Sequence, residues 1–103
     1  MRSLLQAGKP EGVVGYAVDL GEAGGVRVVS RAQAVVACMR AEGLLGLAGF
    51  AVLVCGRSRW ASAVWTGKTW QVIVGDYHKT LWVVGVYEGA GEAWKSLEEV
   101  CVL

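Results

Sequence analysis

The stretch from Gly49 to Tyr87 constrains the fold more than any other part of the chain. It begins with three short runs rich in Val, Trp and Ala: Phe50–Cys55, Trp60–Thr66 and Thr69–Gly75. Each run has the length and the content of β-branched and aromatic residues that are typical of a strand. The segments Gly56–Arg59 and Gly67–Lys68 between them are short and consist of turn residues. The stretch therefore predicts a three-stranded antiparallel meander.

The first of these runs is apolar on both of its faces. Because side chains alternate along a strand, the even-numbered residues from Phe50 to Val54 share one face and the odd-numbered residues from Ala51 to Cys55 share the other. A strand with two apolar faces is usually covered on both sides. We therefore expect a central antiparallel sheet with helices on both of its faces.

A second hairpin and a long helix precede the meander. Val13–Leu20 and Val26–Val29 have the composition of strands, and the Gly-rich segment 21–25 between them is typical of a hairpin loop. Ser30–Gln33 has the pattern of a capping box, in which the Ser and Gln side chains each bond a free backbone amide at the start of a helix. The pattern predicts a helix over Arg31–Leu45.

Two ends and one ambiguous segment complete the chain. Arg2–Ala7 predicts a short helix, and apolar residues that recur at helical spacing from Ala90 to Cys101 predict an amphipathic C-terminal helix. Thr80–Tyr87 is rich in Val, Trp and Tyr, which favours a strand, but it could also open the final helix. The fold class expected is α+β, with a five-stranded sheet made of a two-stranded hairpin and, after the long helix, the three-stranded meander.

The predicted long helix has two apolar faces that differ in side-chain size. The larger side chains lie on one face and only small ones on the other: Ala32, Val35, Val36 and Met39 on the first, and Ala34, Ala37, Cys38 and Ala41 on the second. We expect the larger face to pack on the sheet. Small side chains allow the close approach of another helix, so the second face predicts contact with a partner helix.

The composition indicates one domain over residues 1–103 that needs a partner. Hydrophobic residues make up 54% of the 103 residues and charged residues 18%, below the roughly 25% usual in soluble domains. A small domain cannot bury so much apolar area alone, so a second copy of the chain is the simplest partner. The net charge of +1 argues neither for nor against binding to nucleic acid. The chain lacks Asn, a trend seen in hyperthermophile proteins, although its low charge content opposes a thermophile origin.

The same sequence argues against a membrane or an oxidising compartment. The longest run without a charge, Gly43–Gly56, is shorter than the ~20 residues of a spanning helix, and the N-terminal residues lack the apolar core of a signal peptide. Cys38, Cys55 and Cys101 are odd in number and lie in apolar sequence, which indicates buried free thiols. We expect a cytoplasmic protein.

No motif of catalysis, cofactor binding or metal binding stands out. Gly67-Lys68-Thr69 is similar to the end of a phosphate-binding loop, but the first Gly of that motif would fall on Ser62, and the residues after it indicate a strand rather than a helix. His78 is the single histidine and has no cluster of Cys or acidic residues around it. We therefore expect no enzyme activity, no cofactor and no metal ion.

The order of elements resembles the Roadblock/dynein light chain family, which has a longin-like, profilin-related fold. The resemblance covers nearly the whole chain and is carried by element order and by local patterns: GVVGYAVDL before a Gly-rich hairpin, the Ala-rich helix, and the sheet run that ends GKTWQVIVGD. It departs from the family at the turn after the first strand, which is GEAGG here. The family's topology would assign Thr80 onward to the last helix.

The resemblance implies a non-enzymatic homodimer that acts as a scaffold or regulator of a small Ras-like GTPase or of a dynein-type motor. In such a dimer the long helix would pair with its copy, and Phe50–Cys55 would join its copy edge to edge into one continuous sheet. The residues that fit these contacts come from the small helix face and from the even positions of the strand: Ala34, Ala37, Cys38, Ala41, Phe50, Val52 and Val54.

Two other functions stay open. Aromatic and basic residues gather around the first meander hairpin and suggest stacking on single-stranded nucleic acid: Arg57, Arg59, Trp60, Trp65, Lys68 and Trp70. The same residue types are favoured in protein interfaces, and they form an alternative partner surface. The other function is a small-ligand sensor with a pocket between the sheet and the final helix.

Overall fold

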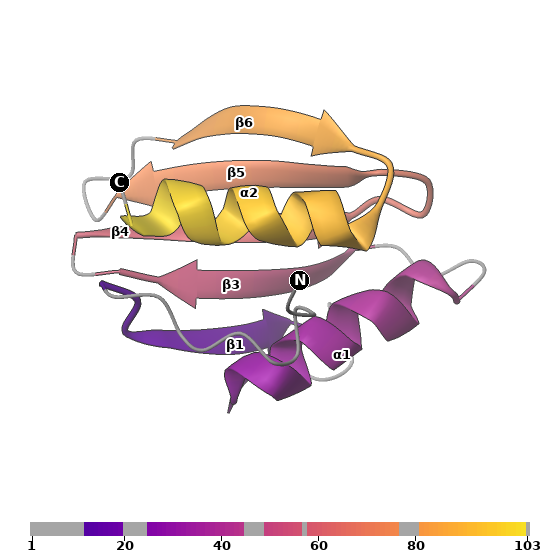
Figure 1. The fold of residues 1–103 in the computed structure, drawn as a ribbon, viewed down its shortest axis with the longest axis horizontal. Coiled ribbons are helices and arrows are strands. Elements are labelled where there is room, and N and C mark those ends of the chain that lie inside the picture. Colours follow the sequence, from indigo (N-terminus) through magenta and orange to yellow (C-terminus); the bar gives the residue numbers. More distant parts are fainter. Residues whose placement is uncertain (1–11, 20–24, 45–48, 57, 77–80, 103) are drawn as a thin grey trace, which may run out of the picture.

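The computed structural model describes residues 12–19, 25–44, 49–56, 58–76 and 81–102, which form an α+β domain. Its elements follow in the order β1 (Gly15–Asp19), β2 (Val26–Val29), α1 (Arg31–Glu42), β3 (Phe50–Cys55), β4 (Arg59–Trp65), β5 (Trp70–Asp76), β6 (Leu81–Tyr87) and α2 (Ala90–Val102). The strands form a six-stranded antiparallel sheet in the order β2-β1-β3-β4-β5-β6. Figure 1 shows both helices on the same side of this sheet.

This architecture confirms the fold class and corrects two details. The sheet has six described strands rather than five, because Leu81–Tyr87 pairs with β5 instead of opening the final helix. Its Val-rich sequence favours the extended backbone, in which branched side chains lose less freedom than in a helix. The two described helices do not lie on both faces: α1 and α2 contact each other and the same side of the strands. The predicted helix at Arg2–Ala7 lies outside the described residues.

Local sequence explains where the elements begin and end. Ser30 Oγ accepts a hydrogen bond from the Gln33 amide, and the Gln33 side chain accepts one from the Ser30 amide, so the capping box is confirmed. Helix α1 ends at Glu42, before Gly43. Thr66 and Thr69 close the turn between β4 and β5, and Gly67 adopts a positive φ of 99° there. That turn confirms that the GKT sequence belongs to a hairpin.

The covered face of the sheet holds the core. Residues paired across the strands share a face, and on this face they are buried. Phe50, Trp65 and Trp70 lie in one row at one end of the sheet, and Tyr16 lies toward the other end. The buried residues of this face are Tyr16, Val18, Phe50, Val52, Val54, Ala61, Ala63, Trp65, Trp70, Val72 and Val74. Ala93, Trp94 and Leu97 of α2 are also buried and belong to the same core cluster as these sheet residues.

A polar cluster ties the start of α1 to the end of α2. Arg31 donates two hydrogen bonds to Glu98, from Nε to Oε2 at 2.9 Å and from Nη2 to Oε1 at 2.8 Å. Tyr16 Oη and Trp94 Nε1 also donate to Glu98, at 2.5 and 2.9 Å. The rings of Tyr16 and Trp94 stack with centroids 5.7 Å apart, and the guanidinium of Arg31 lies 5.5 Å from the Trp94 ring centroid. One carboxylate therefore joins β1, α1 and α2.

A second carboxylate joins the opposite ends of the same helices. Glu42, the last residue of α1, accepts hydrogen bonds from Trp70 Nε1 at 3.0 Å and from the backbone amide of Ala90, the first residue of α2. Amides at a helix N-terminus are free to bind an anion, and the helix dipole favours negative charge there. Because Arg31 meets Glu98 and Glu42 meets Ala90, α1 and α2 run antiparallel on one face of the sheet.

Candidate interaction surface

The other face of the sheet carries no described helix, and we call it the open face. Its residues follow from the alternation along each strand and from the register of the pairs. It is made almost entirely of apolar residues: Ala17, Val26, Val28, Ala51, Leu53, Cys55, Trp60, Val64, Ile73, Leu81, Val83 and Val86. Gly15, Asp19, Ser62, Gln71 and Gly75 fill its other positions.

Charge is nearly absent from the open face. Asp19, at the end of β1, is its one charged residue among the described strands. Val83 and Val86 on the outer strand β6 expose 58% and 57% of their surface, and Val28 on the opposite outer strand exposes 82%. Large apolar patches are rare on monomeric proteins, where they mark contacts with partners. The face is therefore the strongest candidate site in the described part of the chain.

The residues predicted for a dimer interface lie instead inside the chain. Ala34, Cys38 and Ala41 are buried, and Ala37 packs against the core. The three strand residues Phe50, Val52 and Val54 are also buried, on the covered face. Strand β3 is flanked by β1 and β4, so it has no free edge to join to a copy. The structure does not support these seven residues as contacts with a second copy.

The two faces of α1 are thus used in the reverse of the predicted way. The small side chains face inward, and Met39 from the larger face is 49% exposed, although Val35 is buried. Helices α1 and α2 contact each other within the chain. The buried small face of α1 is therefore covered by the chain's own core.

The residues considered for nucleic acid do not form one platform. Trp65 is buried on the covered face against Trp70, with ring centroids 5.1 Å apart, while Trp60 lies on the open face. Arg59 begins β4 and Lys68 lies in the turn beyond its end, so about 20 Å of strand separates them. Arg57 lies outside the described residues. The arrangement leaves no row of stacking rings beside a basic rim.

The described residues hold no group of three or more side chains that could bind a metal ion. His78 lies outside them. Cys38 is buried, and burial, followed by the nearby charge of Glu42, raises the pKa of its thiol to about 12. A thiol rather than a thiolate at neutral pH is a poor nucleophile. Cys55 is half-buried on the open face.

Sequence reasoning missed the open face although its signal was present. The odd positions from Ala51 to Cys55 were recognised as apolar, and the same alternation continues through Ile73 and Val83 on β5 and β6. We assigned the cover of that face to a helix of the same chain. Because both helices lie on the other face, these positions remain uncovered by any described element.

Neither helix in the described part of the chain is long and apolar enough to cross a bilayer. No protein-family model matches the chain, and comparison with curated proteins and with solved structures gave no significant match.

Proposed function

We propose that this chain is a non-enzymatic interaction module that forms a homodimer through its open face. The observation that carries the proposal is an antiparallel sheet with helices on one face and a nearly uncharged, apolar surface on the other. Two such faces pack against each other about 10 Å apart in β-sandwich proteins, where their side chains form a common core. A dimer of this kind would turn two half-covered sheets into one covered sandwich.

A second copy suits this face better than a charged partner. Asp19 is the one charge on its described positions, so the face offers little electrostatic selectivity toward an acidic or basic surface. An apolar and nearly neutral surface is complementary to itself, and a twofold axis lets the same patch serve both subunits. The sequence resemblance to Roadblock proteins also supports a dimer, and its Ras-like GTPase partner stays a prediction.

The size of the face is adequate for a dimer. Six strands about 4.8 Å apart span about 24 Å, and seven residues extend about 23 Å, which gives a projected area of about 550 Å². The accessible surface of corrugated side chains exceeds this projection. A standard protein interface buries about 800 Å² per partner, so the open face approaches that size.

Single lysines on the open face test the proposal. We expect Leu53→Lys in the central strand β3 and Val83→Lys in β6 to weaken dimerisation at least about 100-fold, because each dimer then buries two unpaired charges. The measurement is the mass by light scattering behind size exclusion over a range of concentrations. Met39→Lys is the matched control, since Met39 is exposed on α1 on the other side of the molecule.

Two outcomes would overturn the proposal. A wild-type chain that stays monomeric at all concentrations removes the dimer. A dimer that is broken by Val83→Lys but not by Leu53→Lys would point to edge-to-edge pairing through β6, whose Leu81–Tyr87 backbone has a free edge. Circular dichroism of each variant confirms that the monomer has kept its fold.

Thiol labelling gives a second expected result for the same interface. Both proteins carry Cys101→Ser. Cys55 should react with Ellman's reagent about tenfold more slowly in the dimer that has Val83 than in the Val83→Lys monomer, because the dimer interface covers Cys55. At protein concentrations well above the dissociation constant, few chains are dissociated and open to the reagent. Cys38 should stay unreactive in both, since burial keeps it protonated. Equal rates for Cys55 in dimer and monomer would contradict an interface over the open face.

A further inference from the structure

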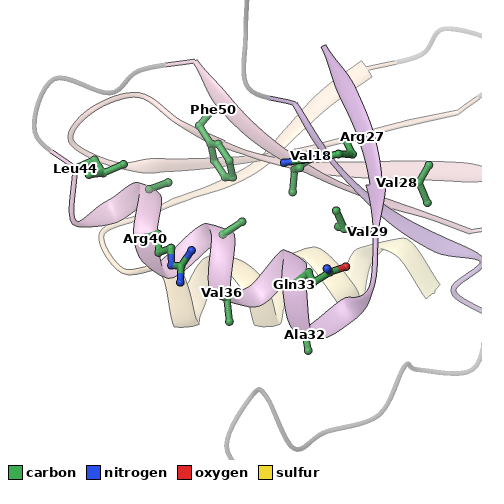
Figure 2. A pocket seen from close by; sticks show the side chains of 12 residues that line it. Val18, Arg27, Val28, Val29, Ala32, Gln33, Val36, Arg40, Leu44 and Phe50 are labelled. Atoms are coloured by element: carbon green, nitrogen blue, oxygen red, sulfur yellow. The ribbon is translucent and has the colours of Figure 1, made fainter. Parts of the chain in front are cut away.

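A cavity lies on the covered side of the sheet, between α1 and the strands at the β2 end. It has a volume of about 680 Å³ and lies away from α2, unlike the pocket expected from the sequence. Val18, Val29 and Phe50 from the strands and Ala37 and Ala41 from α1 form apolar walls. In Figure 2 the helix lies below the cavity and the strands above it, with Phe50 and Leu44 at one end and Arg27 and Val29 at the other. Cavities of this size suit small molecules.

All the charge in the lining is positive. Arg27 comes from β2 and Arg40 from the last turn of α1, and the lining residues that the structure describes include no acidic side chain. Neither arginine forms an ion pair or a side-chain hydrogen bond with another residue in the described part of the chain. Arg31, the other arginine of α1, differs because it pairs with Glu98. Arg40 also complements the dipole at the helix end. Arg27, on a strand, has no such role.

Gln33 adds a third donor. Its Oε1 accepts the capping-box hydrogen bond from the Ser30 amide at 2.9 Å, which fixes the orientation of the side-chain amide. The amide nitrogen is then left to donate toward the cavity that Gln33 lines. The described lining therefore offers two guanidinium groups and this amide nitrogen as donors, and no carboxylate, beside apolar walls.

We infer that this cavity binds a small amphipathic anion, with an apolar body against the walls and a carboxylate attracted by two guanidinium groups, Arg27 on the strand side and Arg40 on the helix side. Guanidinium groups bind carboxylates through paired, charge-assisted hydrogen bonds. The apolar walls provide area for an alkyl or aromatic body, and the opening to solvent keeps the head group close to the exposed arginines. Arg27 pairs with Val18 on the covered face and Arg40 belongs to α1, so both arginines lie on the opposite side of the sheet from the open face. Val28 of the outer strand β2 lines the cavity and also belongs to the open face.

The test uses decanoate as the probe, with isothermal titration calorimetry on the full chain. We expect saturable binding of one decanoate per chain with a dissociation constant below about 1 mM. Arg27→Gln and Arg40→Gln should each weaken binding about tenfold or more, since each removes a charged donor. Lys95→Gln, an equal loss of charge at an exposed position of α2 outside the cavity, should change it less than about twofold.

Two more measurements distinguish binding at the anion site from nonspecific hydrophobic binding at the surface. Decanol, which has the same chain without the charge, should bind at least about tenfold more weakly than decanoate. Ala37→Leu, which narrows the cavity and keeps both arginines, should weaken decanoate binding while the melting temperature stays close to that of the wild type. Absence of saturable binding, equal affinity for decanol, or unchanged affinity in both arginine variants would each overturn the inference.

Discussion

Replacement of Glu98 by leucine is expected to lower the free energy of unfolding by about 3–5 kcal/mol. The side chains of Glu98 and Arg31 expose only 12% and 9% of their surface, so the change removes the carboxylate that pairs with a nearly buried guanidinium. It also leaves the hydroxyl of Tyr16 and the indole N–H of Trp94 without their acceptor. The loss is a large part of the 5–15 kcal/mol that stabilises a typical domain. Chemical unfolding followed by circular dichroism measures it.

Glu99→Leu is the matched control, because Glu99 is exposed on the same helix. It should change the free energy of unfolding by less than about 0.5 kcal/mol. Arg31→Leu combined with Glu98→Leu should be at least about 1 kcal/mol more stable than the sum of the single changes predicts, since both members of the ion pair are then removed together. All variants are compared at one protein concentration, because dimerisation adds to apparent stability. Equal losses in Glu98→Leu and Glu99→Leu would contradict the role of the cluster.

The same carboxylate predicts a pH dependence. Burial alone would raise the pKa of Glu98, but hydrogen bonds from Arg31 and Tyr16 outweigh it and hold the pKa below its usual value. The folded state therefore binds a proton at Glu98 less readily than the unfolded state does. The stabilisation is complete above the unfolded pKa of about 4.3 and is lost as the pH falls through the lower pKa of the folded state. In a plot of the free energy of unfolding against pH, the decrease on the acid side should therefore be less steep for Glu98→Leu than for the wild type.

The sequence predicted those parts of the fold that depend on local chemistry. The hairpin strand Val26–Val29 and the strand Phe50–Cys55 have the bounds expected, and the capping box at Ser30 starts α1 at Arg31. Alternation along a strand and the hydrogen bonds of a cap involve residues that are close in sequence. Such features can therefore be read from neighbouring residues.

The parts that sequence reasoning missed depend on contacts between distant residues. Nothing local to Glu42 shows that it caps the start of α2, 48 residues later. Glu98 is likewise 67 residues from Arg31 and 82 from Tyr16. These contacts hold α1 and α2 side by side on one face, and that placement leaves the open face without a described helix. A prediction of the interface from the sequence lacks this information, because apolar faces do not show which element covers them.

Trp70→Ala is the second change with a large expected effect, a loss of about 3–5 kcal/mol in the free energy of unfolding. Trp70 is fully buried, and its ring packs edge-on to Phe50 and beside Trp65, with centroids 6.3 and 5.1 Å away. Removal of the indole leaves a cavity between the sheet and the helix ends. The matched control is Trp82→Ala, which should cost less than about 1 kcal/mol because Trp82 is 45% exposed on β6.

Trp70→Phe separates the packing of the indole from its hydrogen bond to Glu42. Phenylalanine keeps a ring between the neighbouring aromatic side chains but cannot donate to the Glu42 carboxylate. If Glu42 links the helix ends to the sheet, Trp70→Phe and Glu42→Leu, which has no acceptor, should be coupled by about 0.5–1.5 kcal/mol in a double-mutant cycle. Additive effects would mean that Glu42 acts on α2 through the Ala90 amide alone, and that the indole contributes by filling space.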